Sequence, residues 1–194
     1  MTIFFIIVLV FSAILHECAH GYMAEWLGDS TARYAGRLTL NPIPHLDPIG
    51  SIILPVLFTL FPTGLFFAYA KPVPFNPYNL RNQKYGPGMV AAAGPLSNLL
   101  LAFVFGFLSR YFTDPMLVSF LVVVVKVNVS LAIFNLVPIP PLDGSKVLFT
   151  ILPDSLGHYR DLLEKNGWIF LLIFIWLFSA WLSPIIDAVV RLFV

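Results

Sequence analysis

The chain has 194 residues, of which 59% are hydrophobic, 15% aromatic and only 11% charged, and its formal net charge is +1. A soluble domain carries about 25% charged residues, so this composition excludes a water-soluble globular protein and indicates an integral membrane protein. The near-neutral charge argues against binding to nucleic acid, and the single cysteine, Cys18, excludes a disulfide within the chain.

Membrane spans are expected where about 20 consecutive residues are mostly apolar. In chain order, the stretches that meet this length are 2–27, 88–110, 115–137 and 167–193. A further apolar stretch, 49–70, carries Pro55 and Pro62, and proline removes a backbone donor and bends a helix. We therefore expect 49–70 either to cross the bilayer as a kinked helix or to enter it and return on the same side.

After the first span, residues 33–40 (RYAGRLTL) alternate between polar and apolar side chains, which indicates a small β element. The expected fold class is an all-α polytopic membrane protein: a helix bundle with a re-entrant or broken hydrophobic hairpin and a small β element after the first helix. Residues 1–194 show no internal repeat and are expected to form a single membrane-embedded domain. Lys126 lies inside 115–137, where a charge requires a partner or a path for water.

The sequence HECAH, residues 16–20, places ionisable side chains inside the first apolar stretch. His16 and His20 are four residues apart and share one face of a helix, which is the spacing by which two imidazoles bind one zinc ion. Glu17, beside that face, could take a proton from a water molecule activated by the metal. The alternative is a hydrogen-bonded polar cluster, which the cost of burying three such groups in lipid disfavours.

Zinc enzymes usually supply three protein ligands and keep one position open. Asp143 lies in NLVPIPPLDG, residues 135–144, directly after an apolar stretch, and Gly144 beside it permits close approach of another backbone. Asp143 could therefore be the third ligand or the N-cap of a helix at 145–152. The residues alone leave both possibilities open.

Together, HECAH, GPLSN (residues 94–98) and NLVPIPPLDG occur in the order found in the site-2 protease family of intramembrane zinc metalloproteases, which this chain resembles. The resemblance is to the short prokaryotic type without an added regulatory domain. It implies that His16, His20 and Asp143 hold one zinc ion per chain and that Glu17 is the catalytic base. The implied reaction is hydrolysis of peptide bonds in membrane-spanning or membrane-associated proteins.

The resemblance also suggests that Asn135 lies near the substrate backbone or the developing oxyanion. Asn98 is expected either to make a similar contact or to face the core of the bundle, because the small residues around it let helices approach. A substrate helix must unwind before it is cut, and a strand edge in this chain could then pair with its main chain. The residues expected to form that edge are Arg37, Leu38, Thr39 and Leu40. The alternative is an ordinary connecting hairpin.

A zinc site shared by these residues also restricts the directions in which the membrane spans can run. The histidines and Asp143 can share one ion only if 2–27 and 115–137 run parallel, which requires 49–70 to return to its own side. Most lysines and arginines outside the spans then gather on the side of the site, and such residues mark the cytoplasmic side. We therefore expect a multi-pass cell-membrane protein with external N- and C-termini and an active site open toward the cytoplasm. The expected partners are the lipid bilayer and a transmembrane protein substrate, with no nucleic acid.

Two other classes of protein stay open at this stage. A zinc transporter could bind the metal in transit, although transporters more often show paired sites or inverted repeats, which this sequence lacks. A non-catalytic membrane scaffold would be expected if one of the candidate residues His16, Glu17, His20 or Asp143 had been lost.

Overall fold

Long apolar helices form the centre of the structure, a computed structural model that describes residues 1–53 and 70–194. They are α1 (Thr2–Trp26), α4 (Gly86–Ser109) and α5 (Pro115–Asn135). Each is long and apolar enough to cross a membrane, and they correspond to the predicted spans 2–27, 88–110 and 115–137. Of the stretch 49–70, for which a re-entrant or kinked hairpin is expected, residues 54–69 lie outside the described residues.

Shorter helices and one further long helix complete the described chain. They are α2 (Thr31–Tyr34), η1 (Ile43–His45), η2 (Pro48–Ile53), η3 (Pro77–Asn79), α6 (Asp143–Ile151), η4 (Asp154–Leu156) and α7 (Gly157–Phe193). The N-terminus of α5 illustrates how local sequence sets these limits. The Asp114 side chain accepts a 2.8 Å hydrogen bond from the backbone N–H of Leu117, and Pro115 occupies the first turn.

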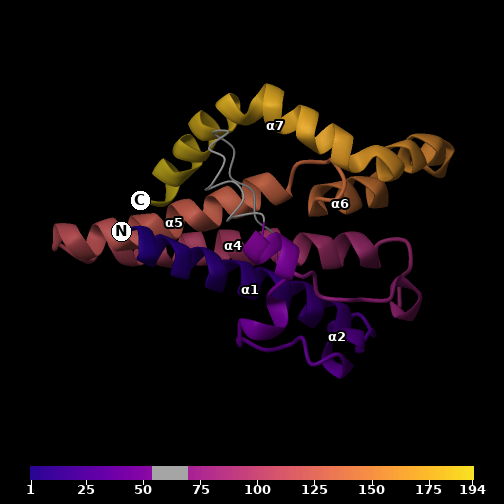
Figure 1. Ribbon diagram of the computed structural model, residues 1–194, viewed down its shortest axis with the longest axis horizontal. Coiled ribbons are helices and arrows are strands. Elements are labelled where there is room, and N and C mark those ends of the chain that lie inside the picture. Colours follow the sequence, from indigo (N-terminus) through magenta and orange to yellow (C-terminus); the bar gives the residue numbers. More distant parts are fainter. Residues whose placement is uncertain (54–69) are drawn as a thin grey trace.

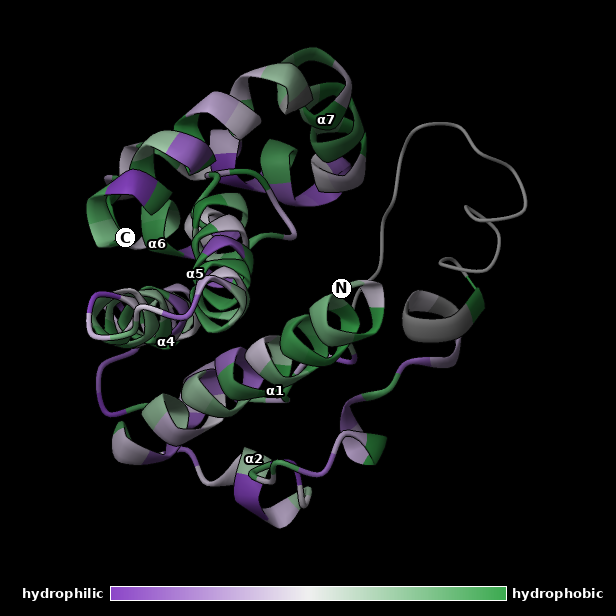
Figure 2. Ribbon diagram, turned by 90° about the vertical axis from the view of Figure 1, so that its left-hand side faces the viewer, coloured by the Kyte–Doolittle hydropathy of each residue, from purple (hydrophilic) through white to green (hydrophobic). Residues whose placement is uncertain are grey.

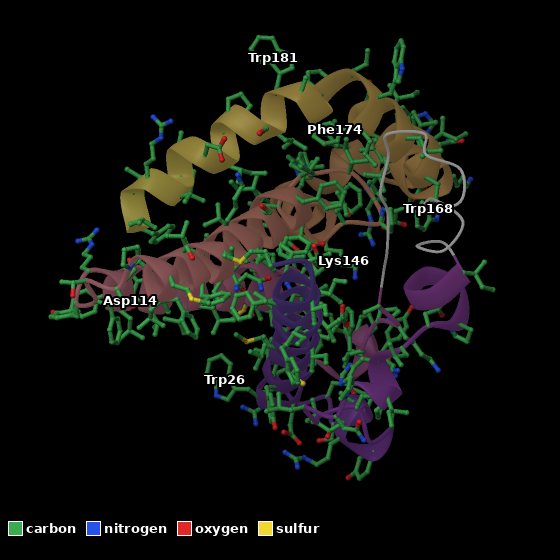
Figure 3. All side chains as sticks on the ribbon, turned by 60° about the vertical axis from the view of Figure 1, so that its left-hand side comes forward. Trp26, Asp114, Lys146, Trp168, Phe174 and Trp181 are labelled. Carbon is green, nitrogen blue, oxygen red and sulfur yellow. The ribbon has the colours of Figure 1, made fainter. Side chains whose placement is uncertain are left out.

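Helix α4 lies between α1 and α5, and small side chains line its contacts (Figure 1). Its buried residues include Gly88, Ala91, Gly94, Ala102 and Gly106, and small residues let helix backbones approach closely in a membrane. Large apolar side chains lie on the outside instead. Figure 2 shows the long helices predominantly hydrophobic along their length, and Figure 3 shows Trp26 and Trp181 pointing away from the bundle. The outer surface is therefore suited to contact with lipid.

Helices α1 and α5 run in the same direction, and α4 runs opposite to both (Figure 1). The C-terminal halves of α1 and α5 consequently lie at the same end of the bundle, where α6 begins. Both chain termini lie at the other end. This parallel arrangement is the one that a metal site shared between α1 and α6 requires.

Helix α7 arches over α5 and bends by 75° between residues 157–178 and 180–193. Together its two halves are long and apolar enough for one more span, in the region of the predicted stretch 167–193. The second half packs on α5, where Lys126 Nζ lies 2.9 Å from Asp187 Oδ1. Lys126 thus has the partner that a charge within a span requires.

The predicted small β element after the first helix is wrong, because residues 1–53 and 70–194 contain no strand. Residues 31–34 form α2, and Gly36 then turns the chain with a φ of +65°. The N–H of Arg37 closes the turn onto the carbonyl of Ala32 at 3.0 Å. The carbonyl of Thr39 accepts hydrogen bonds from side chains rather than from a neighbouring strand. Side-chain partners and a glycine turn therefore use the backbone groups that a sheet would need.

Residues 71–76, which we call the crossing segment, run in extended form past the C-terminal half of α1. At one end, the N–H of Lys71 donates to the carbonyl of His45 (2.9 Å), and Arg37 Nη2 donates to the carbonyl of Lys71 (2.5 Å). At the other end, the N–H of Asn76 donates to Asp29 Oδ2 (2.6 Å). Because both ends are held by buried side chains or backbone, the crossing segment has a fixed path over α1.

Candidate metal centre

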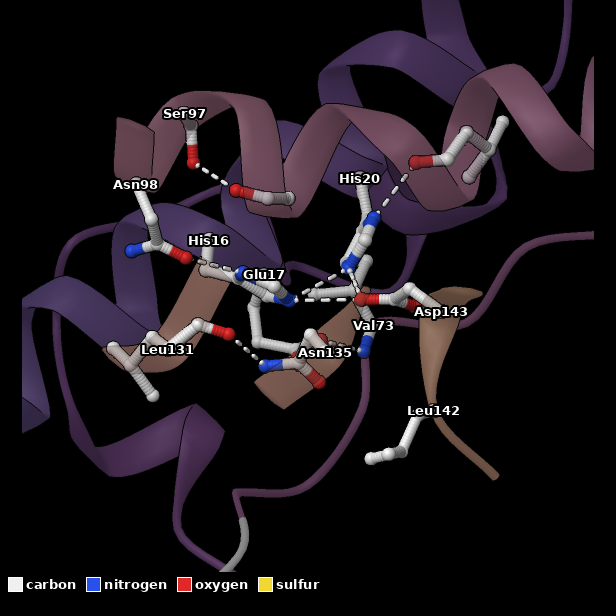
Figure 4. Close-up of polar contacts among 12 residues, drawn as sticks. His16, Glu17, His20, Val73, Ser97, Asn98, Leu131, Asn135, Leu142 and Asp143 are labelled. Carbon is white, nitrogen blue, oxygen red and sulfur yellow. Dashed lines mark hydrogen bonds and ion pairs between the residues drawn. The ribbon is translucent and has the colours of Figure 1, made fainter. Parts of the chain in front are cut away.

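Three ligand atoms from two distant parts of the chain meet beside α1 (Figure 4). The Nε2 atoms of His16 and His20 are 3.0 Å apart, and Asp143 Oδ2 lies 3.1 Å from the first and 3.2 Å from the second. Tetrahedral zinc with bonds of about 2.0 Å separates its ligand atoms by about 3.3 Å. The described residues therefore fit a zinc ion in both donor type and spacing.

The other nitrogen of each imidazole is fixed by a hydrogen bond to an oxygen atom. His16 Nδ1 donates to Asn98 Oδ1 at 2.6 Å, and His20 Nδ1 donates to the carbonyl of Val90 at 2.7 Å. Protonation at Nδ1 leaves the lone pair on each Nε2 directed toward Asp143. Such outer partners set the tautomer and the ring orientation of metal-binding histidines.

Asn98 belongs to a buried polar chain rather than to the surface of the site. Its Nδ2 donates to Asn128 Oδ1 at 2.9 Å, and Asn128 Nδ2 donates to Ser12 Oγ at 3.0 Å. Asn98 and Asn128 are fully buried. Two roles are expected for Asn98, a contact with substrate or a position in the core. In the structure Asn98 faces the core and accepts the hydrogen bond of His16. Sequence reasoning missed Asn128 and Ser12, although two polar residues within apolar helices were a usable signal.

Gly94 allows α4 to pass directly behind the two imidazoles. A Cβ atom at this position would lie 2.5 Å from His20 Nε2 and 2.6 Å from His16 Cε1. No side chain larger than hydrogen fits there without moving the rings. The glycine of GPLSN therefore serves the geometry of the histidine pair.

Asp143 is the first residue of α6, and Leu142 occupies the N-cap position. Its carboxylate turns toward the histidines, so it does not cap the helix as the alternative interpretation had it. Its Oδ2 lies 3.1 Å from His16 Nε2 and 3.2 Å from His20 Nε2, so one carboxylate oxygen and two imidazole nitrogens could bind the same cation.

Glu17 lies beside the three ligand residues and is not part of their cluster. Its Oε2 accepts a 2.7 Å hydrogen bond from the backbone N–H of Val73 in the crossing segment. Glu17 and the ligand residues line a cavity of about 150 Å³, and water occupies about 30 Å³ per molecule. The cavity therefore has room for several water molecules beside Glu17 and the candidate metal ligands.

Asn135 also lines this cavity, and its Nδ2 donates to the carbonyl of Leu131 at 2.9 Å. Its position beside the ligands is compatible with the predicted contact to substrate. The strand edge predicted for residues 37–40 does not form, because that part of the chain contains no strand. Arg37 is buried against Lys71, and Leu40 is exposed.

The sequence profile of peptidase family M50 matches residues 112–179. The chain is 37% identical over 183 residues to "Putative zinc metalloprotease YwhC" of Bacillus subtilis, a match that covers 89% of this chain and 80% of that protein.

Other relatives carry the same kind of name. Rip2 of Mycolicibacterium smegmatis is 32% identical over 177 residues, which cover 87% of this chain and 64% of Rip2. MJ0611 of Methanocaldococcus jannaschii is 47% identical over 62 residues, which cover 31% of this chain and 32% of that protein. No solved structure matches the chain.

Proposed function

This chain belongs to peptidase family M50, and on that basis we propose how its residues carry out proteolysis. It is an intramembrane zinc metalloprotease of the site-2 type, a multi-pass membrane protein that uses zinc and acts on protein substrates. The assignment of individual residues rests on one observation. Two imidazole nitrogens and one carboxylate oxygen converge within 3.0–3.2 Å of one another, with a fourth ionisable residue beside them.

In this proposal His16, His20 and Asp143 hold the metal, and Glu17 is the general base. A zinc ion bound there would polarise the substrate carbonyl and lower the pKa of water in the cavity. Glu17 accepts a proton from the attacking water at the oxygen that remains free of Val73 and later gives it to the leaving amine. The N–H of Val73 holds Oε2 of Glu17, so the second oxygen has a fixed orientation.

Asn135 is proposed to contact the substrate backbone, because it lines the same cavity as Glu17 and the ligands. We propose a transmembrane or membrane-associated protein as substrate, since the site lies within helices that are apolar enough to span a bilayer. One domain over 1–194 would then supply all the catalytic groups.

We propose that the active site opens toward the cytoplasm and that both termini are external. Most basic residues outside the spans belong to segments at the end of the bundle where the site lies, and cytoplasmic loops carry an excess of such residues. They are Arg33, Arg37, Lys71, Arg81, Lys84, Lys146, Arg160 and Lys165. Only Arg110 and Arg191 belong, among the described residues, to the opposite end.

The test is metal analysis of the purified protein together with a cleavage assay on a single-span protein, with and without chelator. We expect about one zinc ion per chain, loss of cleavage with chelator, and recovery when zinc is restored. Cleavage that persists in metal-free protein would overturn the proposal. An accessibility assay with cysteines placed at either end of the bundle tests the orientation separately.

A further inference from the structure

A second cavity, of about 400 Å³, adjoins the cavity of the metal centre. Phe75 and Lys146 belong to the linings of both cavities, so the second cavity lies directly beside the candidate metal centre. The second cavity is formed by the segment around η3, the start of α4, α6 and the start of α7. It contains none of the metal ligands and has no part in the chemistry proposed above.

Positive charge and aromatic rings dominate the lining of this second cavity. Its charged residues are Lys84, Lys146, Arg160 and Glu164. The single carboxylate is already engaged, because Arg160 Nε donates to Glu164 Oε1 at 3.1 Å. The cavity therefore presents an excess of positive charge to anything that occupies it.

Two of the cations are held over aromatic faces. Lys146 Nζ lies 5.5 Å from the centre of the Phe75 ring, and Arg160 Cζ lies 5.6 Å from the centre of the Phe149 ring. An aromatic ring contacts one side of each cation. N–H groups on the opposite side of the cation can donate hydrogen bonds to a carboxylate.

We propose that the second cavity binds the polar segment of the substrate next to the scissile bond and favours acidic residues in it. This inference rests on the proposed function and names a substrate preference for the same site. A peptide is the expected occupant because the second cavity shares Phe75 and Lys146 with the cavity that is lined by Glu17 and the candidate metal ligands. A partly exposed charge pair changes affinity by up to about fivefold, so a short acidic segment gives a measurable preference.

The experiment uses the full chain in detergent and three test substrates that share one membrane span. The polar segment next to the cleaved span carries glutamates, glutamines or lysines. The test variant is Lys84→Glu combined with Arg160→Gln, since both residues line only the second cavity and the change makes its lining net negative. The control is Lys165→Glu, because Lys165 is exposed on the same helix as Arg160 and does not belong to the lining.

We expect the wild-type protein and the control to cleave the acidic substrate with a kcat/KM about fivefold above that of the glutamine substrate. The double variant should lose or invert this preference, measured as the ratio of its kcat/KM values for the acidic and glutamine substrates. Equal cleavage of all three substrates by the wild-type protein would overturn the inference and leave the protease function intact. Cleavage of none would overturn both.

A lipid occupant gives a different result. If anionic phospholipid in vesicles raises cleavage of every substrate, and the double variant alone loses that effect, the cavity binds a lipid headgroup and the peptide proposal is wrong.

Discussion

The backbone N–H of Val73 donates a 2.7 Å hydrogen bond to Oε2 of Glu17, which lies 56 positions earlier in the chain. This contact joins the candidate base on α1 to the crossing segment. Since a backbone donor is present whatever the side chain, its role can be tested only by removing the N–H itself.

Replacing Val73 with proline removes that N–H, whereas Val73→Ala keeps it. A hydrogen bond to a charged group contributes about 1.5–3 kcal/mol, so we expect kcat of Val73→Pro to fall about 10- to 100-fold. Prolines already flank position 73, so the extended backbone there suits a further proline. Steady-state kinetics on a single-span substrate and zinc content are the measurements. Equal activity of the proline and alanine variants would show that the contact does not position Glu17.

Glu17→Gln keeps the shape of the side chain but removes the proton acceptor. We expect zinc content to stay near that of the wild type, because Glu17 is not in the ligand cluster. Cleavage should fall by about 10²–10⁴, the usual contribution of a general base. A variant that retains full activity would remove Glu17 from the mechanism.

Asp143→Ala should lower zinc affinity, because it deletes one of three converging ligand atoms. Removing a residue that only hydrogen-bonds a metal ligand lowers metal affinity about 10- to 100-fold. We therefore expect removal of a ligand itself to lower zinc affinity by at least about 100-fold. Zinc titration in competition with a chelator measures it. Asp161→Ala removes an exposed carboxylate elsewhere and should leave zinc binding unchanged; similar losses in both variants would point to a general effect of charge.

Asn98→Ala removes the acceptor for His16 Nδ1. We expect zinc affinity to fall about 10- to 100-fold because the imidazole loses its fixed orientation. The neighbouring Ser97 offers a matched control, since among the described residues its Oγ bonds only the carbonyl of Gly94 on its own helix. Ser97→Ala with the same loss as Asn98→Ala would assign the effect to helix packing.

Asp29 predicts a dependence of stability on acid pH. Burial raises the pKa of this carboxylate, but hydrogen bonds from Thr31, Asn79 and Asn76 outweigh it and lower the pKa below its ordinary value of 3.8. The folded protein therefore binds fewer protons at Asp29 than the unfolded chain does. The contribution of Asp29 to the free energy of unfolding is complete above about pH 4. This contribution is lost as the pH falls through the lower pKa of the folded state.

Asp29→Asn should lower the free energy of unfolding by about 1–3 kcal/mol at neutral pH, because an amide nitrogen replaces one acceptor. The variant should also show a weaker loss of stability between pH 4 and pH 2 than the wild type. Thermal unfolding midpoints over this range measure both effects. Parallel pH curves for the two proteins would contradict the assignment.

The convergence of the candidate ligand residues could be predicted because each of them belongs to a short sequence motif. The i, i+4 spacing of His16 and His20 fixes a shared helix face, and Asp143 stands out by its motif. The hydrogen bonds that surround these residues could not be predicted from the sequence. The contact of Val73 uses a backbone N–H, which leaves no trace in residue type, and the anchoring of Asn76 by Asp29 joins distant loops.

The wrong prediction of a β element has a similar cause. The alternation in residues 33–40 describes side chains but not the backbone partners that a strand requires. Gly36 turns the chain, and the carbonyl of Thr39 bonds to Cys18 and His45, so no partner segment can pair there. Short alternating stretches near a membrane surface are therefore weak evidence for a sheet.

The backbone of α4 passes closely behind the imidazoles at Gly94, and the carboxylate of Asp143 faces them from the other side. Together with the hydrogen bonds at both Nδ1 atoms, these neighbours set the positions of the rings through the protein itself. Loading with metal then demands almost no reorganisation, and stripping followed by reconstitution should be reversible without unfolding the chain.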